Sequence, residues 1–246
     1  MTRTIAGAFA ALVAAASFLV TPAMAAGGYS LFDGATYVSP GHNSNRAVQL
    51  TSNSSVPDSG INYSVPSGMT FADIKTLSTD YMFTAGSCGG GSPRFQINVL
   101  GKNAFVYIGP PPNYTNCPQN VWVNTGNLAT PTSFIDTSQL PGGTFYDTFA
   151  SADAKYGSAV VTGIQLVADS GWAFPATGQV VQIDNTMINN TLYTYEQTSA
   201  EDCKDGGYKN FSTAPGPFKN QGQCVSYFNS NGNHGSDSGN HGGGGD

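Results

Sequence analysis

Polar and apolar side chains alternate between residues 94 and 99, in an order that could serve sugar recognition. On an extended strand, Arg94, Gln96 and Asn98 share one face, and the apolar residues between them share the other. Guanidinium and amide groups suit sugar hydroxyls because they offer paired donors and acceptors. Gln165 likewise lies between two apolar residues, Ile164 and Leu166. The alternative is the wet face of an antiparallel sheet without a ligand.

Aromatic rings could complete such a site, because their apolar faces can pack on the apolar face of a sugar ring. Tyr114 lies in a proline-rich stretch that predicts a stiff loop, and Trp172 is expected at a strand end. Packing in the core or at its rim is the alternative for each aromatic side chain. The rings considered are Tyr107, Tyr114, Trp122, Tyr146 and Trp172, and those retained as ligand-binding candidates are Tyr107, Tyr114 and Trp172.

Three glycines, Gly89 to Gly91, follow Cys88 directly. A phosphate-binding loop requires a following helix whose N-terminus meets the phosphate. Pro93 and a strand pattern follow instead, and no Lys-Ser/Thr pair is present. The run therefore predicts a tight turn tethered by Cys88.

Asp184 is the candidate metal ligand, within the alternating stretch Val180–Met187. A structural calcium could be held there by its carboxylate and by backbone carbonyls, since calcium takes oxygen ligands. A turn or surface carboxylate is the alternative. The sequence contains no 12-residue calcium loop of the helix–loop–helix type.

Catalytic signatures are sparse. His42 is the only histidine before the C-terminal tail, and no G-x-S-x-G nucleophile motif occurs. A glycosidase needs two carboxyl groups on either side of the scissile bond. Glu196 and Glu201 both fall near the end of the main domain, which leaves an aspartate pair such as Asp147 and Asp169. The sequence favours a non-catalytic protein.

Four cysteines, an even number, predict two disulfides in an exported protein. Four cysteines allow three pairings. We expect the local one, Cys88–Cys117 and Cys203–Cys224, because each pair encloses a loop-rich segment. No C-x-x-C spacing indicates zinc.

The N-terminus predicts export. Arg3 precedes an apolar run from Ile5 to Val20, and small residues around Ala25 provide a cleavage site, so residues 1–25 are expected to be a signal peptide. No later stretch is apolar and long enough for a membrane span. The net charge is −6 and charged residues make up 10% of the chain, against about 25% in an average globular protein. Without clustered Lys and Arg, a nucleic-acid partner is excluded.

Residues 26–198 contain short alternating or apolar runs, which are separated by Gly, Pro, Asn, Asp and Ser. This pattern predicts an all-β fold, an antiparallel β-sandwich of jelly-roll type. Helical turns are expected only in Thr70–Ser78 and Thr144–Gly157. Residues 199–230 are expected to form a small module stapled by a disulfide, since they are too few to bury a core of their own. Residues 231–246 are rich in Gly, Asn and His and are expected to be a disordered tail.

The stretches Leu77–Val99, Pro141–Phe149 and Gly163–Glu196 resemble a group of exported bacterial proteins of unassigned function. Their central domain is similar to a lectin-like or carbohydrate-binding-module sandwich. The segment Cys203–Val225 resembles a two-cysteine module that ends many exported bacterial proteins, with Tyr208 in the place of the usual tryptophan. The resemblance of Val180–Asn189 to the closing strand of sugar-binding jelly rolls implies a calcium role for Asp184.

These observations predict a secreted, extracellular or periplasmic protein that binds a polysaccharide or cell-surface glycan without catalysis. Two alternatives remain open. One is a structural or adhesive extracellular protein without a small ligand, and the other is a polysaccharide hydrolase or lyase.

Overall fold

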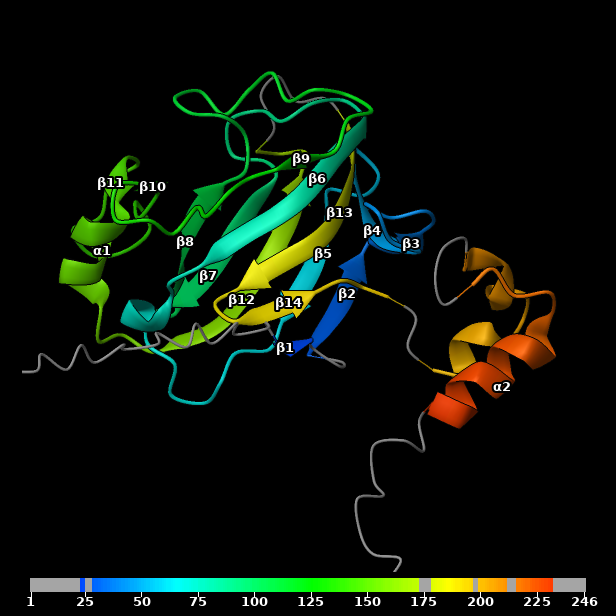
Figure 1. The fold of residues 1–246 in the computed structure, drawn as a ribbon. Coiled ribbons are helices and arrows are strands. Elements are labelled where there is room, and N and C mark those ends of the chain that lie inside the picture. The colour runs from blue at the N-terminus through cyan, green and yellow to red at the C-terminus, as the bar shows by residue number, and fades with distance from the viewer. Residues whose placement is uncertain (1–22, 25–27, 173–177, 197–198, 212–215, 232–246) are drawn as a thin grey trace, which may run out of the picture.

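Most of the strands of this protein pair in antiparallel orientation. The computed structural model describes residues 23–24, 28–172, 178–196, 199–211 and 216–231. Most of the expected signal peptide, and residues 232–246 of the expected tail, lie outside the described residues. Two main sheets are stacked as a sandwich (Figure 1), which confirms the predicted all-β class.

A five-stranded sheet has the order β2-β5-β12-β7-β8, and every pair in it is antiparallel. Its central strand is therefore β12, whose register places Gln165 opposite both Asn62 and Gln96. The strands are β2 (Tyr29–Asp33), β5 (Asp58–Tyr63), β7 (Arg94–Val99), β8 (Lys102–Tyr107) and β12 (Val161–Asp169).

The second sheet is built around β13, its longest strand. One edge of β13 pairs with β6 over almost its whole length, so β4 and β14 must share the other edge, each along one half of β13. Strand β9 extends the sheet beyond β6, β3 extends it beyond β4, and β1 pairs with β14 in parallel. The strands are β1 (Ala23–Met24), β3 (Thr36–Val38), β4 (Ala47–Ser52), β6 (Leu77–Ala85), β9 (Val123–Asn124), β13 (Gln179–Ile188) and β14 (Thr191–Tyr193).

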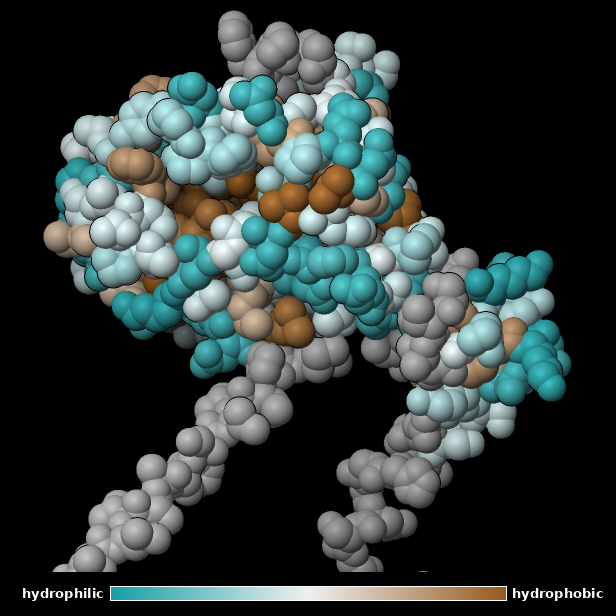
Figure 2. All heavy atoms as spheres, turned by 45° about the horizontal axis from the view of Figure 1, so that its top comes forward, coloured by the Kyte–Doolittle hydropathy of each residue, from teal (hydrophilic) through white to brown (hydrophobic). Residues whose placement is uncertain are grey.

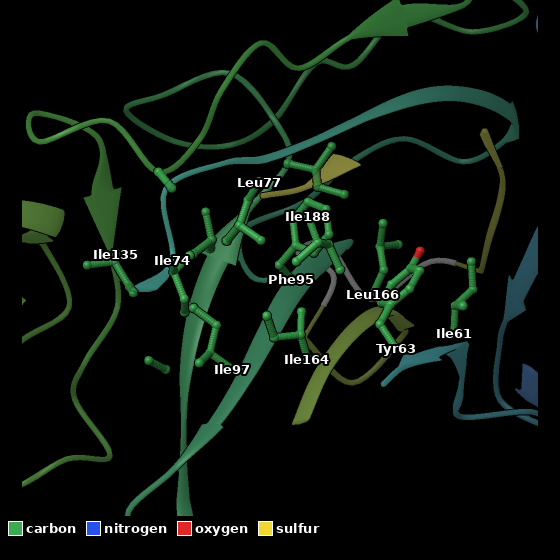
Figure 3. Packing of buried hydrophobic residues seen from close by; sticks show 14 of the residues in the cluster. Ile61, Tyr63, Ile74, Leu77, Phe95, Ile97, Ile135, Ile164, Leu166 and Ile188 are labelled. Atoms are coloured by element: carbon green, nitrogen blue, oxygen red, sulfur yellow. The ribbon is translucent and has the colours of Figure 1, made fainter. Parts of the chain in front are cut away.

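The core fills the space between the two sheets (Figure 3). Phe95, Ile97 and Val99 are fully buried there, as their alternation with polar residues predicts. Burial of each such side chain contributes about 1.5–3 kcal/mol. Because β7 is fixed by this apolar face, Gln96 and Asn98 must face outward.

The two short helical segments and a separate two-stranded sheet lie at one end of the sandwich (Figure 1). Of the two expected helical segments, Thr70–Ser78 contains only the 3-10 helix η1 (Phe71–Asp73), because β6 already begins at Leu77. The other contains helix α1 (Phe149–Tyr156), which begins where the Thr148 hydroxyl accepts a hydrogen bond from the Ser151 amide. Beside α1, a two-stranded sheet joins β10 (Phe134–Ile135) to β11 (Asp147–Thr148).

Both predicted disulfides are confirmed, Cys88–Cys117 and Cys203–Cys224. The second one belongs to a small apolar cluster of its own with Phe211, around which Tyr208, Phe218, Val225 and Phe228 pack. This module is helical and lies at the right in Figure 1. Its elements are η2 (Glu201–Cys203), η3 (Gly207–Asn210) and α2 (Gln221–Asn231), the last ending one residue inside the expected tail.

Candidate functional site

A row of side-chain amides crosses the outer face of the five-stranded sheet. Gln96 Nε2 donates to Gln165 Oε1 at 2.7 Å, and Gln165 Nε2 donates to Asn62 Oδ1 at 2.6 Å. We call Asn62, Gln165 and Gln96 the amide row. All three side chains are half-buried. Each amide nitrogen carries two N–H groups and each oxygen two lone pairs, and the row uses one donor of each glutamine, so further donors and acceptors remain for a ligand.

Asn98 lies one step along the same face, where its amide donates to Asn103 Oδ1 at 2.6 Å. The two residues face each other across β7 and β8 in register. The polar face that the sequence predicts for β7 is thus present. It continues onto the neighbouring strands on both sides of β7.

Arg94 belongs to this face but is only 4% exposed, so its predicted role as an open ligand contact needs correction. Its guanidinium donates to Gly91 O and to Asp169 Oδ2, both at 3.0 Å. The guanidinium carbon lies 4.5 Å from the ring centroid of Trp172 and 5.1 Å from that of Phe105. The Nε atom is buried without a hydrogen-bond partner among the described residues. Arg94 therefore supports the face from beneath.

Trp172 covers Arg94, whose guanidinium lies 3.5 Å from Gln96 Oε1 of the amide row, and the Trp172 ring remains 39% exposed. It is held there by Phe105, at a centroid distance of 5.0 Å, and by its backbone carbonyl, which accepts from the Gly91 amide at 3.1 Å. A Cβ atom at Gly91 would lie 2.8 Å from the Trp172 ring. The glycine run is thus a tight turn, as predicted, and it leaves room for the indole.

Tyr107 and Tyr114 meet at the β8 edge of the sheet, with ring centroids 5.1 Å apart. Tyr107 lies opposite Arg94 in register and donates its hydroxyl hydrogen bond to Asp136. Burial, together with that hydrogen bond, raises the pKa of Tyr107. Tyr114 is only 8% exposed, so the expected open platform on the proline loop is wrong.

Both tyrosines line a cavity of about 210 Å³ next to the outer face. The exposed ring of Phe134 lines the same cavity. Tyr146 packs edge-on against Phe134 at 6.0 Å between centroids and is itself exposed. Figure 2 shows apolar side chains in hollows of a surface that is otherwise mostly polar. Phe134 was not identified from the sequence, where a single aromatic residue in a loop gives no signal.

Acidic side chains balance the charge of Arg94 at this end of the sheet. Asp58 and Asp169 face each other in register, and Asp33 adds a third carboxyl group nearby. Burial, followed by the charges of Asp33 and Asp169, raises the pKa of Asp58. Because three carboxyl groups face one guanidinium, this surface favours a neutral ligand over an anionic one.

Asp184 lies on the other sheet and is fully buried. Its carboxylate accepts from the His42 amide at 2.8 Å, the Ser44 hydroxyl at 2.6 Å and the Asn185 amide at 2.7 Å. Burial raises its pKa to about 6. These three donors occupy most of the roughly four lone-pair positions of the carboxylate. Among the described residues, no three His, Cys, Asp or Glu side chains are grouped to hold a metal ion.

Comparison of the chain with protein families, with curated proteins and with solved structures gives no match. Within the described ranges, no helix combines the length and apolar composition needed to cross a bilayer.

Proposed function

We propose that the protein is exported and binds a neutral polysaccharide or cell-surface glycan on the outer face of its five-stranded sheet. The observation that carries the proposal is the exposed ring of Trp172 beside the half-buried amide row. An aromatic ring and a line of amides are complementary to a sugar chain, whose rings have apolar faces and whose hydroxyls both donate and accept.

Rigidity of this face supports binding. Trp172 is fixed by Phe105, Arg94 and the Gly91 turn, and the amides are fixed by one another. Side chains that are already ordered lose less conformational entropy when a ligand binds. The resemblance of this part of the chain to lectin-like sandwiches points to the same ligand class.

Export is supported by the two disulfides, because such bonds persist in oxidising compartments. The N-terminal pattern of one basic residue, an apolar run and small residues agrees with this.

A pull-down panel of insoluble neutral and anionic polysaccharides, with the full chain in calcium and in chelator, tests the proposal. We expect retention on at least one neutral polysaccharide and equal retention in chelator, because Asp184 is already satisfied by protein donors. Failure to bind any polysaccharide in either buffer would contradict the proposal and favour a structural role.

A further inference from the structure

His42 and Asp80 form a hydrogen-bonded pair on the opposite outer face of the sandwich. His42 Nδ1 lies 2.7 Å from Asp80 Oδ2. The Asp80 side chain is 7% exposed, whereas that of His42 is 30% exposed. The imidazole also stacks on the indole of Trp122, with centroids 5.1 Å apart and an interplanar angle of 10°. The ring is thus fixed in both position and tilt.

Two asparagines fix Asp80 in turn. Asn124 Nδ2 donates to Asp80 Oδ1 at 2.6 Å, and Asn185 Nδ2 donates to Oδ2 at 2.8 Å. These residues come from the strands on either side of Asp80, β9 and β13. A buried carboxylate oriented by these two asparagine donors is well suited to hold an imidazole in one orientation.

The loop that carries His42 is pinned at several points. Asp184 accepts from the His42 amide and the Ser44 hydroxyl, and Glu196 accepts from the Asn45 amide at 2.9 Å. A Cβ atom at Gly41 would lie 2.5 Å from Asp184 Oδ2, so only glycine lets the loop approach this closely. The imidazole is therefore presented on a rigid support.

This geometry leaves Nε2 as the reactive nitrogen. A carboxylate next to Nδ1 favours the tautomer that carries its hydrogen there, and the lone pair then resides on Nε2. No hydrogen bond joins Nε2 to any described residue, and it is not among the buried unpartnered atoms. An imidazole oriented in this way is the arrangement of a general base.

We propose that His42 and Asp80 form an acid–base site that hydrolyses small, neutral acyl esters. Asp80, Asp184 and Glu196 surround the loop with carboxyl groups, which disfavours an anionic phosphate ester. Cleavage of a glycosidic bond needs two carboxyl groups at the substrate, but Asp184 is fully buried and Asp80 holds His42. An acyl ester needs only a base and water.

The reaction balances without a cofactor. His42 Nε2 takes a proton from water while the water oxygen bonds to the acyl carbon, and the carbonyl electron pair moves to its oxygen. Collapse of this intermediate breaks the bond to the alkoxide, which receives the proton from the imidazolium, giving acid and alcohol. Asp80 acts as a positioning residue that stabilises the imidazolium between the two steps.

Hydrolysis of p-nitrophenyl acetate by the full chain tests this site, with 4-methylimidazole at equal concentration as reference. General-base catalysis contributes about 100-fold or more, so we expect a rate well above the reference and its loss in His42→Gln. We expect Asp80→Asn to lower kcat and leave KM unchanged. The matched control is His234→Gln/His241→Gln, which should retain the full rate, since those are the only other histidines.

A measurement on the unaltered chain covers the case in which a variant fails to fold. Diethyl pyrocarbonate should acylate His42 and abolish the activity, and hydroxylamine should restore it. A wild-type rate no higher than that of 4-methylimidazole would overturn the proposal. So would full activity in folded His42→Gln, or after complete modification of His42.

Discussion

Arg94 and Asp184 are ionisable side chains that lie buried under opposite faces of the sandwich. Arg94 pairs with Asp169, and its guanidinium lies against two aromatic rings that also contact each other. Within the part of the chain that the structure describes, the Asp184 carboxylate accepts no hydrogen bond from a basic side chain and relies on two backbone amides and a hydroxyl. Burial therefore has opposite consequences for the two residues: it strengthens the Arg94–Asp169 pair and disfavours the charge on Asp184.

Asp184 should make stability depend on pH. Its pKa is about 6 in the folded protein against 3.8 as the ordinary value, so the folded state holds this proton more tightly than the unfolded state. The protonated carboxyl group therefore contributes to the free energy of unfolding below about pH 3.8, and this contribution is lost as the pH rises through 6. The total loss is about 3 kcal/mol. In urea unfolding between pH 4 and pH 7, the free energy of unfolding should fall more steeply for the wild-type protein than for Asp184→Asn. An equal change of the free energy of unfolding with pH in the two proteins would contradict this role of Asp184.

Gly91 should control the position of Trp172. Gly91→Ala places a Cβ atom 2.8 Å from the indole ring, so the ring must move or the turn must distort. Overpacking of this kind costs about 1–3 kcal/mol. We expect a lower free energy of unfolding and a shift in tryptophan fluorescence. Gly222→Ala in α2, whose added Cβ atom would lie 3.3 Å from the side-chain oxygen of Asn220 and near no described aromatic ring, is the control and should leave the fluorescence unchanged.

At the scale of elements, the disulfide Cys88–Cys117 joins the two long loops on either side of β7 and β8. The first loop carries Gly91, and the second carries Tyr114 at the edge cavity. The covalent link therefore holds together the turn that supports Trp172 and the wall of the cavity. Removal of this disulfide should therefore lower both the stability of the sandwich and its affinity for the polysaccharide.

Replacement of Cys88 and Cys117 by serine should destabilise the sandwich. The disulfide closes a loop with a sequence separation of 29 residues, for which loop entropy gives about 3–4 kcal/mol. We expect a clearly lower midpoint in urea unfolding and weaker retention on the polysaccharide that the wild-type protein binds. An unchanged midpoint would show that packing alone fixes these loops.

At the scale of the whole molecule, the sandwich and the C-terminal module have separate apolar clusters. An ion pair between Arg46 and Asp202, with 3.6 Å between charged atoms, connects the two parts. Partly exposed pairs of this kind contribute about 0–1 kcal/mol. This ion pair by itself is therefore expected to add little to the stability of the sandwich.

Removal of residues 199–246 should leave the sandwich folded. We expect the shortened chain to unfold within about 1 kcal/mol of the full chain and to bind the same polysaccharide, because the amide row and Trp172 lie in the remaining part. Circular dichroism with urea unfolding and a pull-down measure the two outcomes. Loss of the fold would show that the module completes the sandwich core.

Local sequence patterns were enough to predict the class of fold, the outward face of β7 and the disulfide pairing. They could not predict contacts between distant segments. Arg94 is buried because Trp172, far away in the sequence, folds over it. His42 looked isolated because it lies in a loop and Asp80 follows 38 residues later, in β6. The available signal for the pair was that Asp80 is the only charged residue of β6.

The most direct test of glycan binding compares Trp172→Ala with Tyr227→Ala by depletion binding isotherms on the insoluble polysaccharide that retains the wild-type protein. The two rings are equally exposed, 39% and 40%, but Tyr227 belongs to the C-terminal module. We predict that loss of Trp172 weakens binding about tenfold or more, as for a central contact residue, and that loss of Tyr227 leaves the affinity unchanged. Equal affinities for Trp172→Ala and the wild-type protein would contradict the proposed binding face.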